Sequence, residues 1–129
     1  MVVLLDEGVA RSVELVFRER SHEVRYVVEE PGAESPDVIV AAHAHRIGAA
    51  VVTWNYKHYR RLINRRQRST NELTFPNMGL IGFQCPELDG PNRLRAFIEL
   101  VEREYECVQK IHDRPFHVLV GHSWFQAFR

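Results

Sequence analysis

The chain has 129 residues, which is enough for one ordinary domain and too few for two. Its hydrophobic content of 45% and charged content of 26% are average for globular proteins and exclude a disordered chain, a collagen-like repeat and a coiled-coil rod. No apolar run is long enough to span a membrane and no export signal precedes the first apolar run, so we expect a cytoplasmic protein with no membrane partner. Cys85 and Cys107 form no Cys-x-x-Cys pair, which favours free thiols.

The net charge is zero, but the charges are unevenly distributed along the chain. Residues 1–37 hold nine acidic and four basic side chains, whereas residues 38–71 hold seven basic side chains and no acidic one. Six of these seven lie in residues 57–68, and five of the six are arginines, whose planar guanidinium group suits bidentate contacts with phosphate. The basic segment is expected either to bind a polyanion or to pair with the acidic N-terminal third.

The first part of the chain predicts a strand, a helix and a second strand. Residues 2–5 are an unbroken apolar run, which is typical of a central strand covered on both faces. Residues 9–20 repeat apolar side chains at helical spacing, so they predict an amphipathic helix of about three turns. Residues 22–28 predict the second strand.

A second helix is predicted to begin beside Asp37. Ser35 is a favourable N-cap, Pro36 suits the first helical position, and the Asp37 carboxylate complements the positive end of the helix dipole. Gly48 suits the C-cap of this helix. Residues 49–53 then predict a third strand.

The third predicted helix follows Asn55, which is a favourable N-cap, and carries the basic segment on one face. Its apolar side consists of Tyr56, Tyr59, Leu62 and Ile63. Its opposite side consists of Lys57, Arg61, Asn64, Arg65 and Arg68. The basic segment is therefore expected to be a continuous helix surface.

The C-terminal half predicts a fourth strand, a long helix and a short fifth strand. Residues 78–85 are apolar enough for a buried strand, and residues 94–108 repeat apolar side chains along one face of a long helix. Residues 116–120 predict an edge strand. An aromatic tail at residues 124–128 follows it.

Strands that alternate with helices predict an α/β fold with right-handed crossovers and a mainly parallel sheet of four to five strands. Residues 1–110 are expected to form this domain. Residues 111–129 are expected to add the edge strand and the aromatic tail, which packs either on the domain or on a second copy of the chain. A homodimer is therefore one expected state of the protein.

Polar side chains follow two of the predicted strands. Asp6 and Glu7 follow the first strand, Thr53 and Asn55 lie at the end of the third, and Asp37 opens a helix. Because parallel strands place their carboxyl ends at one edge of the sheet, these side chains are expected to share a pocket. Two carboxylates about 4–5 Å apart repel by roughly 3–4 kcal/mol at an effective dielectric constant of 20, so such a cluster favours a bound cation. Mg²⁺ or Mn²⁺ suits oxygen ligands of this kind.

Four blocks of the sequence, taken in their order and spacing, resemble short PIN-like domains. The blocks are residues 3–8, 20–24, 35–37 and 51–59. Such domains are best known as toxin ribonucleases of bacterial toxin-antitoxin pairs. The resemblance covers roughly residues 1–110 and implies a three-layer α/β sandwich with a mainly parallel sheet. It also implies hydrolysis of RNA with Mg²⁺ or Mn²⁺, and a small antitoxin protein as partner.

On this resemblance, Asp6 and Asp37 match the first two metal-binding carboxylates of the family. Glu7 is a common neighbour of the first carboxylate, and Asn55 matches a third position, where an amide oxygen can coordinate the ion. The implied metal ligands are therefore Asp6, Asp37, Asn55 and Glu7.

The resemblance also implies catalytic roles around the third strand. Thr53 and Asn55 would orient a water molecule that attacks the phosphate. His58 stands where the family has its last carboxylate. Because an imidazole gains and loses protons near neutral pH, His58 could accept the proton from that water.

The basic face of the third helix is the predicted RNA-binding surface. Lys57, Arg61, Arg65 and Arg68 would contact the RNA backbone, which makes binding sensitive to salt. Trp54 is expected either to stack on a base or to pack inside the domain.

Other interpretations give the same residues different roles. Asp6, Asp37 and Asn55 could be helix caps, and a PIN-like domain without catalysis would bind RNA or a protein instead. The segments around Asp6 and Asp37 also resemble receiver domains of two-component signalling. Those domains need an acceptor aspartate, and residues 41–50 contain no acidic side chain, which argues against a phosphoryl switch.

Overall fold

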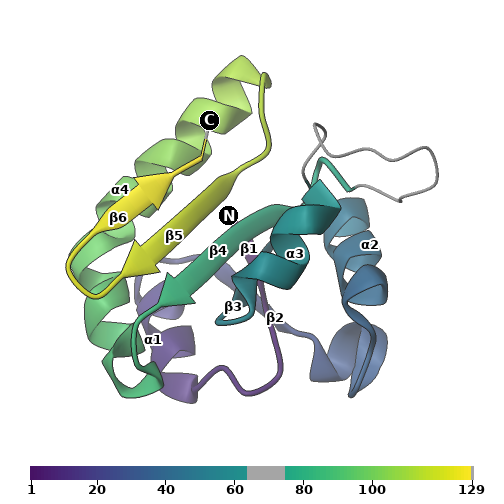
Figure 1. The fold of residues 1–129 in the computed structure, drawn as a ribbon, viewed down its shortest axis with the longest axis horizontal. Helices are drawn as coiled ribbons and strands as arrows, with labels where there is room; N and C mark the ends of the chain where they lie inside the picture. The colour runs from purple at the N-terminus through teal and green to yellow at the C-terminus, as the bar shows by residue number, and fades with distance from the viewer. Residues whose placement is uncertain (64–74, 129) are drawn as a thin grey trace.

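One mixed sheet organises the part of the chain that the structure describes. The structure is a computed structural model and describes residues 1–63 and 75–128. Within these residues, six strands pair in the order β2-β1-β3-β4-β5-β6 (Figure 1). They are β1 (Val2–Leu5), β2 (Glu23–Tyr26), β3 (Ala50–Thr53), β4 (Gly79–Gln84), β5 (His117–Gly121) and β6 (Phe125–Ala127). Strands β1 to β5 are parallel, and β6 is antiparallel to β5.

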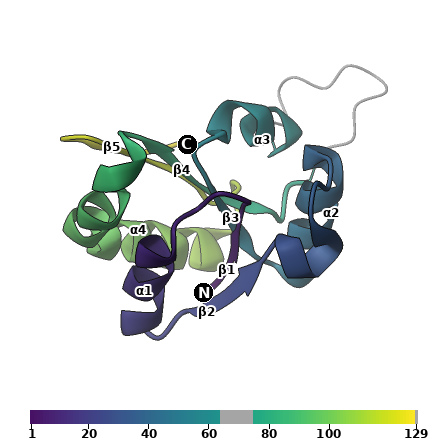
Figure 2. The same ribbon diagram turned by 90° about the horizontal axis from the view of Figure 1, so that it is seen from below.

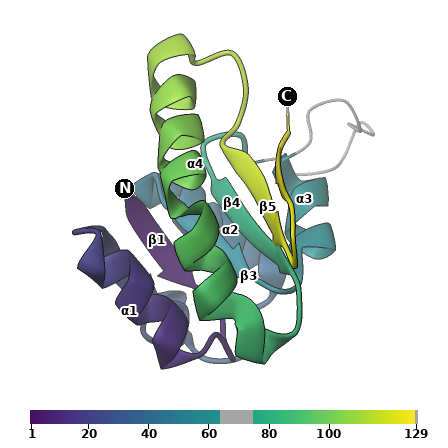
Figure 3. The same cartoon turned by 90° about the vertical axis from the view of Figure 1, so that its left-hand side faces the viewer.

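Helices cover both faces of the sheet. The described residues form α1 (Arg11–Glu19), α2 (Asp37–Ile47), α3 (Tyr56–Ile63) and α4 (Gly90–Ile111), with short helical segments η1 (Val28–Gly32) and η3 (Glu87–Asp89). Helices α1 and α4 lie on one face, and α2 and α3 lie on the other (Figures 2 and 3). The predicted α/β class with a mainly parallel sheet is therefore confirmed. None of the helices in this part of the chain is both long and apolar enough to cross a membrane.

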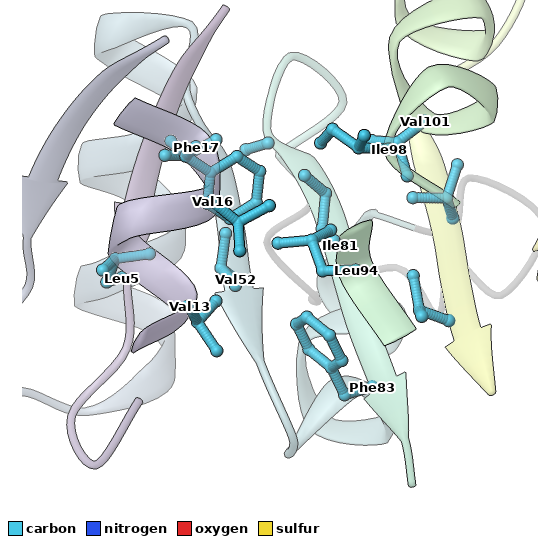
Figure 4. Close-up of a cluster of buried hydrophobic side chains, with 14 of the residues drawn as sticks. Leu5, Val13, Val16, Phe17, Val52, Ile81, Phe83, Leu94, Ile98 and Val101 are labelled. Carbon is cyan, nitrogen blue, oxygen red and sulfur yellow. The ribbon is translucent and has the colours of Figure 1, made fainter. Parts of the chain in front are cut away.

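The central strands are buried on both faces, which explains their unbroken apolar sequences. In β1, Val3 and Leu5 belong to the cluster that α1 and α4 cover, whereas Leu4 belongs to the cluster under α2 and α3. The first cluster also contains Phe17 of α1 and Leu94 of α4 (Figure 4). Burying an apolar side chain of this size stabilises the fold by about 1.5–3 kcal/mol. This packing fixes where the carboxyl ends of the strands lie.

The start of α2 differs from the prediction. Pro36 is the N-cap and α2 begins at Asp37, so the prediction that Ser35 caps the helix is wrong. The Ser35 hydroxyl instead donates a hydrogen bond of 2.7 Å to the carbonyl oxygen of Gly32, which closes the preceding turn. At the other end, Gly48 adopts a φ of 69° and terminates the helix in the left-handed region, as predicted.

The C-terminal segment adds a sixth strand to the predicted four or five. Residues 116–120 are predicted as an edge strand, but β5 lies between β4 and β6. The chain reverses after Gly121, whose backbone N–H donates a 2.8 Å hydrogen bond to the carbonyl of Trp124. A Cβ atom at Gly121 would lie 2.2 Å from the Trp124 ring, so glycine lets this ring pack against the turn. The reversal makes β6 the edge strand.

The aromatic tail packs on the same chain. The Phe125 ring lies 6.1 Å from that of Phe97 on α4, measured between centroids. The Phe128 ring stacks on His117 at 4.1 Å, and the guanidinium carbon of Arg60 lies 4.4 Å from the Phe128 centroid. Of the two alternatives for the tail, packing on the domain therefore accounts for both phenylalanines. A homodimer stays a prediction.

The stacked histidine of β5 makes the fold sensitive to acid. His117 is 4% exposed, and its Nε2 atom has no hydrogen-bond partner among the described residues. Burial, with a smaller contribution from the charge of Arg60, lowers the pKa of His117 from 6.5 to about 3. His117 therefore binds a proton near pH 6.5 in the unfolded chain, but only near pH 3 in the folded chain. Acid favours unfolding by about 1.4 kcal/mol for each pH unit in this window.

We expect His117→Leu to reduce this acid sensitivity. The free energy of unfolding, measured with urea at pH 7, 6 and 5, should fall less steeply with acid in the variant than in the wild type. His122→Leu removes an exposed histidine of the same chain and serves as the control. Equal pH slopes for His117→Leu and the wild type would contradict the assignment.

Candidate functional site

The predicted polar residues gather where the strand order reverses. The chain leaves β1 through α1 to β2 on one side, and α2 then leads to β3 on the other side of β1. In open parallel sheets, ligands bind in the crevice beyond the carboxyl ends of the strands at such a switch point. Asp6 follows β1 and Thr53 ends β3, and the Asp6 backbone N–H donates a 3.1 Å hydrogen bond to the Val52 carbonyl. Both side chains therefore start at this crevice.

Hydrogen bonds fix the orientation of the Asp6 carboxylate. Its Oδ2 atom accepts a 2.8 Å bond from the Thr53 hydroxyl, and its Oδ1 atom accepts a 3.0 Å bond from the Glu7 backbone N–H. The hydroxyl oxygen of Thr53 in turn accepts a 2.9 Å bond from the Asn55 backbone N–H. Thr53 is 1% exposed, so its hydroxyl depends on these two partners. Thr53 positions Asp6 and the start of α3 together.

A buried tyrosine brings the second aspartate into the site. The Tyr59 ring is fully buried, and its hydroxyl lies 3.5 Å from Oδ1 of Asp6. The same hydroxyl also interacts with the carboxylate of Asp37. Asp6 and Asp37, which the sequence predicts to converge, therefore approach one phenol. Helical spacing predicts that Tyr59 lies on the apolar side of its helix, but it does not predict this contact.

The electrostatics of this group follow from its burial. Loss of solvent raises the pKa of Asp6, and the charge of Asp37 raises it further, while the hydrogen bonds from Thr53, Glu7 and Tyr59 oppose the shift. Burial, followed by the two nearby carboxylates, raises the pKa of Tyr59. The phenol therefore keeps its proton and acts as a donor toward the aspartates.

His58 lies on the solvent side of Asp37. Its Nδ1 atom is 3.4 Å from Oδ2 of Asp37, and the two side chains are 55% and 36% exposed. An exposed pair of this kind contributes little to stability. The imidazole is nevertheless accessible to a ligand at the edge of the site, which is compatible with the predicted role as a proton acceptor.

Glu7 is held by a different contact. Its carboxylate accepts a hydrogen bond from the backbone N–H of Glu34, in the loop that leads to α2. Within residues 1–63 and 75–128, no three His, Cys, Asp or Glu side chains cluster closely enough to hold a metal. Asp6 and Asp37 thus interact electrostatically with each other and with the Tyr59 hydroxyl, whereas Glu7 is engaged with the neighbouring loop.

The two aspartates have donors that suit a hard divalent cation. Magnesium sites commonly use one or two carboxylates and keep several water molecules on the ion. Asp6 is partly desolvated beside a second carboxylate, so a cation would relieve both the burial cost and the repulsion. The residues fit Mg²⁺ or Mn²⁺ in an open, hydrated site, with Asn55 at its margin, rather than in a closed protein cage.

Trp54 packs inside the domain. Its ring stacks on Phe83 at 4.3 Å with an interplanar angle of 12°, and its Nε1–H donates a 2.7 Å hydrogen bond to the Cys85 carbonyl. Of the two predicted roles, the structure therefore favours packing. A groove of about 520 Å³, lined by residues 54–58 and 83–85, lies beside this ring and includes Asn55 and His58. Cys85 and Cys107 are both free thiols, as predicted.

The described part of the basic face is solvent-exposed. Lys57 and Arg61 are exposed on α3 and form no ion pair with a described residue, whereas Arg60 lies over Phe128. Among the acidic side chains of the N-terminal third, Glu14 pairs with Arg18, Glu30 with Arg25 and Glu19 with Arg95. Lys57 and Arg61 therefore remain available to a polyanion. Arg65 and Arg68, also predicted to bind RNA, lie outside the described residues.

Comparison of the chain with models of protein families, with curated proteins and with solved structures found no match in any of the three. The resemblance to PIN-like domains therefore depends on the four sequence blocks. The function is inferred from the residues and the geometry of the site.

The contact between Thr53 and Asp6 is testable with Thr53→Val, which keeps the shape of the side chain and removes the hydroxyl. The variant leaves the Oδ2 atom of the half-buried Asp6 carboxylate without its donor, so we expect a loss of about 1–3 kcal/mol in unfolding free energy. The pKa of Asp6 should rise further. The loss should therefore grow as the pH rises through that pKa, because only the ionised carboxylate needs the donor.

Urea unfolding between pH 4 and pH 8 measures this dependence. Thr53→Ser retains the hydroxyl and is the control, expected to follow the wild-type pH profile. A loss in Thr53→Val that does not vary with pH would show that packing, rather than the bond to Asp6, explains it.

Proposed function

We propose that the chain is a metal-dependent ribonuclease, a toxin-type PIN-like protein that hydrolyses phosphodiester bonds of RNA. The observation that carries the proposal is the convergence of Asp6 and Asp37 on the buried Tyr59 hydroxyl, at the switch point of a parallel sheet. The exposed Lys57 and Arg61 on the adjacent α3 support a polyanionic substrate.

Each residue of the site has a defined task in this reaction. Asp6 and Asp37 would hold Mg²⁺ or Mn²⁺, which when bound acidifies a water molecule and offsets negative charge on the phosphate. Thr53 keeps the Asp6 carboxylate in one orientation. His58, 3.4 Å from Asp37, accepts the proton of the attacking water, and the Asp37 carboxylate stabilises the imidazolium that forms.

The basic face of α3 supplies affinity for RNA rather than sequence recognition. Lys57 and Arg61 lie on the same helix as His58 and within two turns of it. Phosphates bound by these two side chains would therefore belong to the part of the RNA that runs away from the acidic pair. An antitoxin partner that covers this surface in the cell is part of the same proposal.

Asp6→Asn is the decisive variant for the nuclease. It preserves the size of the side chain and removes one metal ligand, so we expect cleavage of mixed RNA with Mn²⁺ to fall about 100-fold or more. EDTA should abolish cleavage by the wild type. Asp113→Asn makes the same chemical change on an exposed aspartate paired with Arg114 and should retain full activity.

Intact RNA in every lane, including the wild type with Mn²⁺, would exclude the nuclease. Equal activity in Asp6→Asn and Asp113→Asn would indicate a contaminating enzyme.

Arg61→Ala tests the RNA surface by the salt dependence of binding. If Arg61 contacts one phosphate, the slope of log K against log salt concentration should become less steep by about 0.7 for single-stranded RNA. Fluorescence anisotropy of a labelled RNA between 50 and about 300 mM salt measures that slope. Arg103→Ala removes an exposed arginine from α4 on the other face of the sheet and should leave the slope unchanged.

The second candidate is a PIN-like domain that has lost catalysis and binds RNA or a protein. The observation in its favour is that His58 stands beside Asp37 where the family pattern has a carboxylate, so the described residues contain no third acidic ligand. RNA binding with a normal salt slope, together with no cleavage and no Mn²⁺ binding, would favour this alternative.

A further inference from the structure

We infer that the hydroxyl of Tyr59 is a positioning group that holds the Asp6 and Asp37 carboxylates together for a divalent cation. This inference rests on the proposed metal site and assigns to it a residue that the sequence pattern did not identify. Tyr59 does not bind the ion in this role. It acts through the two aspartates that do.

The ring of Tyr59 is a fixed support. It is fully buried in the cluster under α2 and α3, where it packs with residues of three elements. The same cluster contains Leu4 of β1, Val51 of β3 and Ala41 of α2. A ring enclosed in this way cannot turn its hydroxyl toward solvent, so the hydroxyl stays aimed at the site.

The two aspartates differ in how firmly they are held. Asp6 receives hydrogen bonds from Thr53 and from the Glu7 backbone, independently of Tyr59. Asp37 begins α2, its side chain is 36% exposed, and its other described partner is the exposed His58 at 3.4 Å. The Tyr59 hydroxyl lies 3.5 Å from Oδ1 of Asp6 and also interacts with Asp37, so it offers the less firmly held Asp37 carboxylate an interior partner.

Repulsion between the carboxylates gives this partner its importance. The two carboxylates lie close enough for the charge of Asp37 to act on Asp6. Without the hydroxyl, the Asp37 side chain can relieve that repulsion by turning outward into solvent. A cation would then have to reassemble the pair, and its affinity would decrease. Outer partners of metal ligands commonly contribute 10- to 100-fold to metal affinity.

Tyr59→Phe tests this role because it keeps the buried ring and removes only the hydroxyl. We expect its dissociation constant for Mn²⁺, measured by calorimetry on the protein without RNA, to rise about tenfold or more. In cleavage assays the Mn²⁺ concentration for half-maximal rate should rise by the same factor. The rate at saturating Mn²⁺ should stay close to that of the wild type.

Tyr56→Phe makes the same change one turn earlier on α3, at a half-buried tyrosine beside Gly82, and is the matched control. It should bind Mn²⁺ as the wild type does. If Tyr59→Phe loses stability but binds Mn²⁺ with unchanged or higher affinity, the hydroxyl only satisfies the fold and the inference is wrong. If the wild type itself binds no Mn²⁺, the proposed metal site fails, and the role of Tyr59 fails with it.

Discussion

The hydrogen bond from the Thr53 hydroxyl to the Asp6 carboxylate is the contact on which the candidate site depends. It joins the carboxyl ends of β1 and β3 across the switch point of the sheet. Because Thr53 is almost fully buried, its oxygen must also accept a hydrogen bond, and the backbone N–H of Asn55 provides it. The residue before α3 is thereby fixed relative to Asp6. Tyr59 and His58 reach the aspartates from the helix that this contact orients.

Close packing of α3 on the sheet completes the arrangement. Gly82 of β4 lies under the start of the helix, and a Cβ atom there would be 2.5 Å from the Cβ of Tyr56. Glycine therefore lets α3 approach the strand closely enough for the Tyr59 ring to enter the core. A larger residue at this position would lift the helix and move the phenol from the carboxylates. The site thus depends on a residue that does not touch it.

The sequence predicts the convergence of Asp6 and Thr53 because it depends only on parallel strands ending at one edge. It does not predict the role of Tyr59. Helical spacing correctly assigns the ring to the buried side, but an apolar pattern carries no information about where a phenolic hydroxyl points. Strand β6 was also missed, since three residues are too short for periodicity and its pairing with β5 depends on the turn at Gly121. The ends of parallel strands are predictable because strand direction fixes them, whereas the Tyr59 contact and the pairing of β6 need the packed fold.

The charges at this edge of the sheet balance one another. Asp37 opens α2 and Tyr56 opens α3, so the positive ends of two helix dipoles meet the acidic pair and stabilise it. The same ends, together with Lys57 on α3, attract a phosphate group. A phosphodiester that approaches the pair is therefore drawn by the helices and repelled by the two carboxylates. On the proposed function, a divalent cation held by the two aspartates would offset that repulsion, and an acidic pair and a basic helix face could then serve the same phosphodiester.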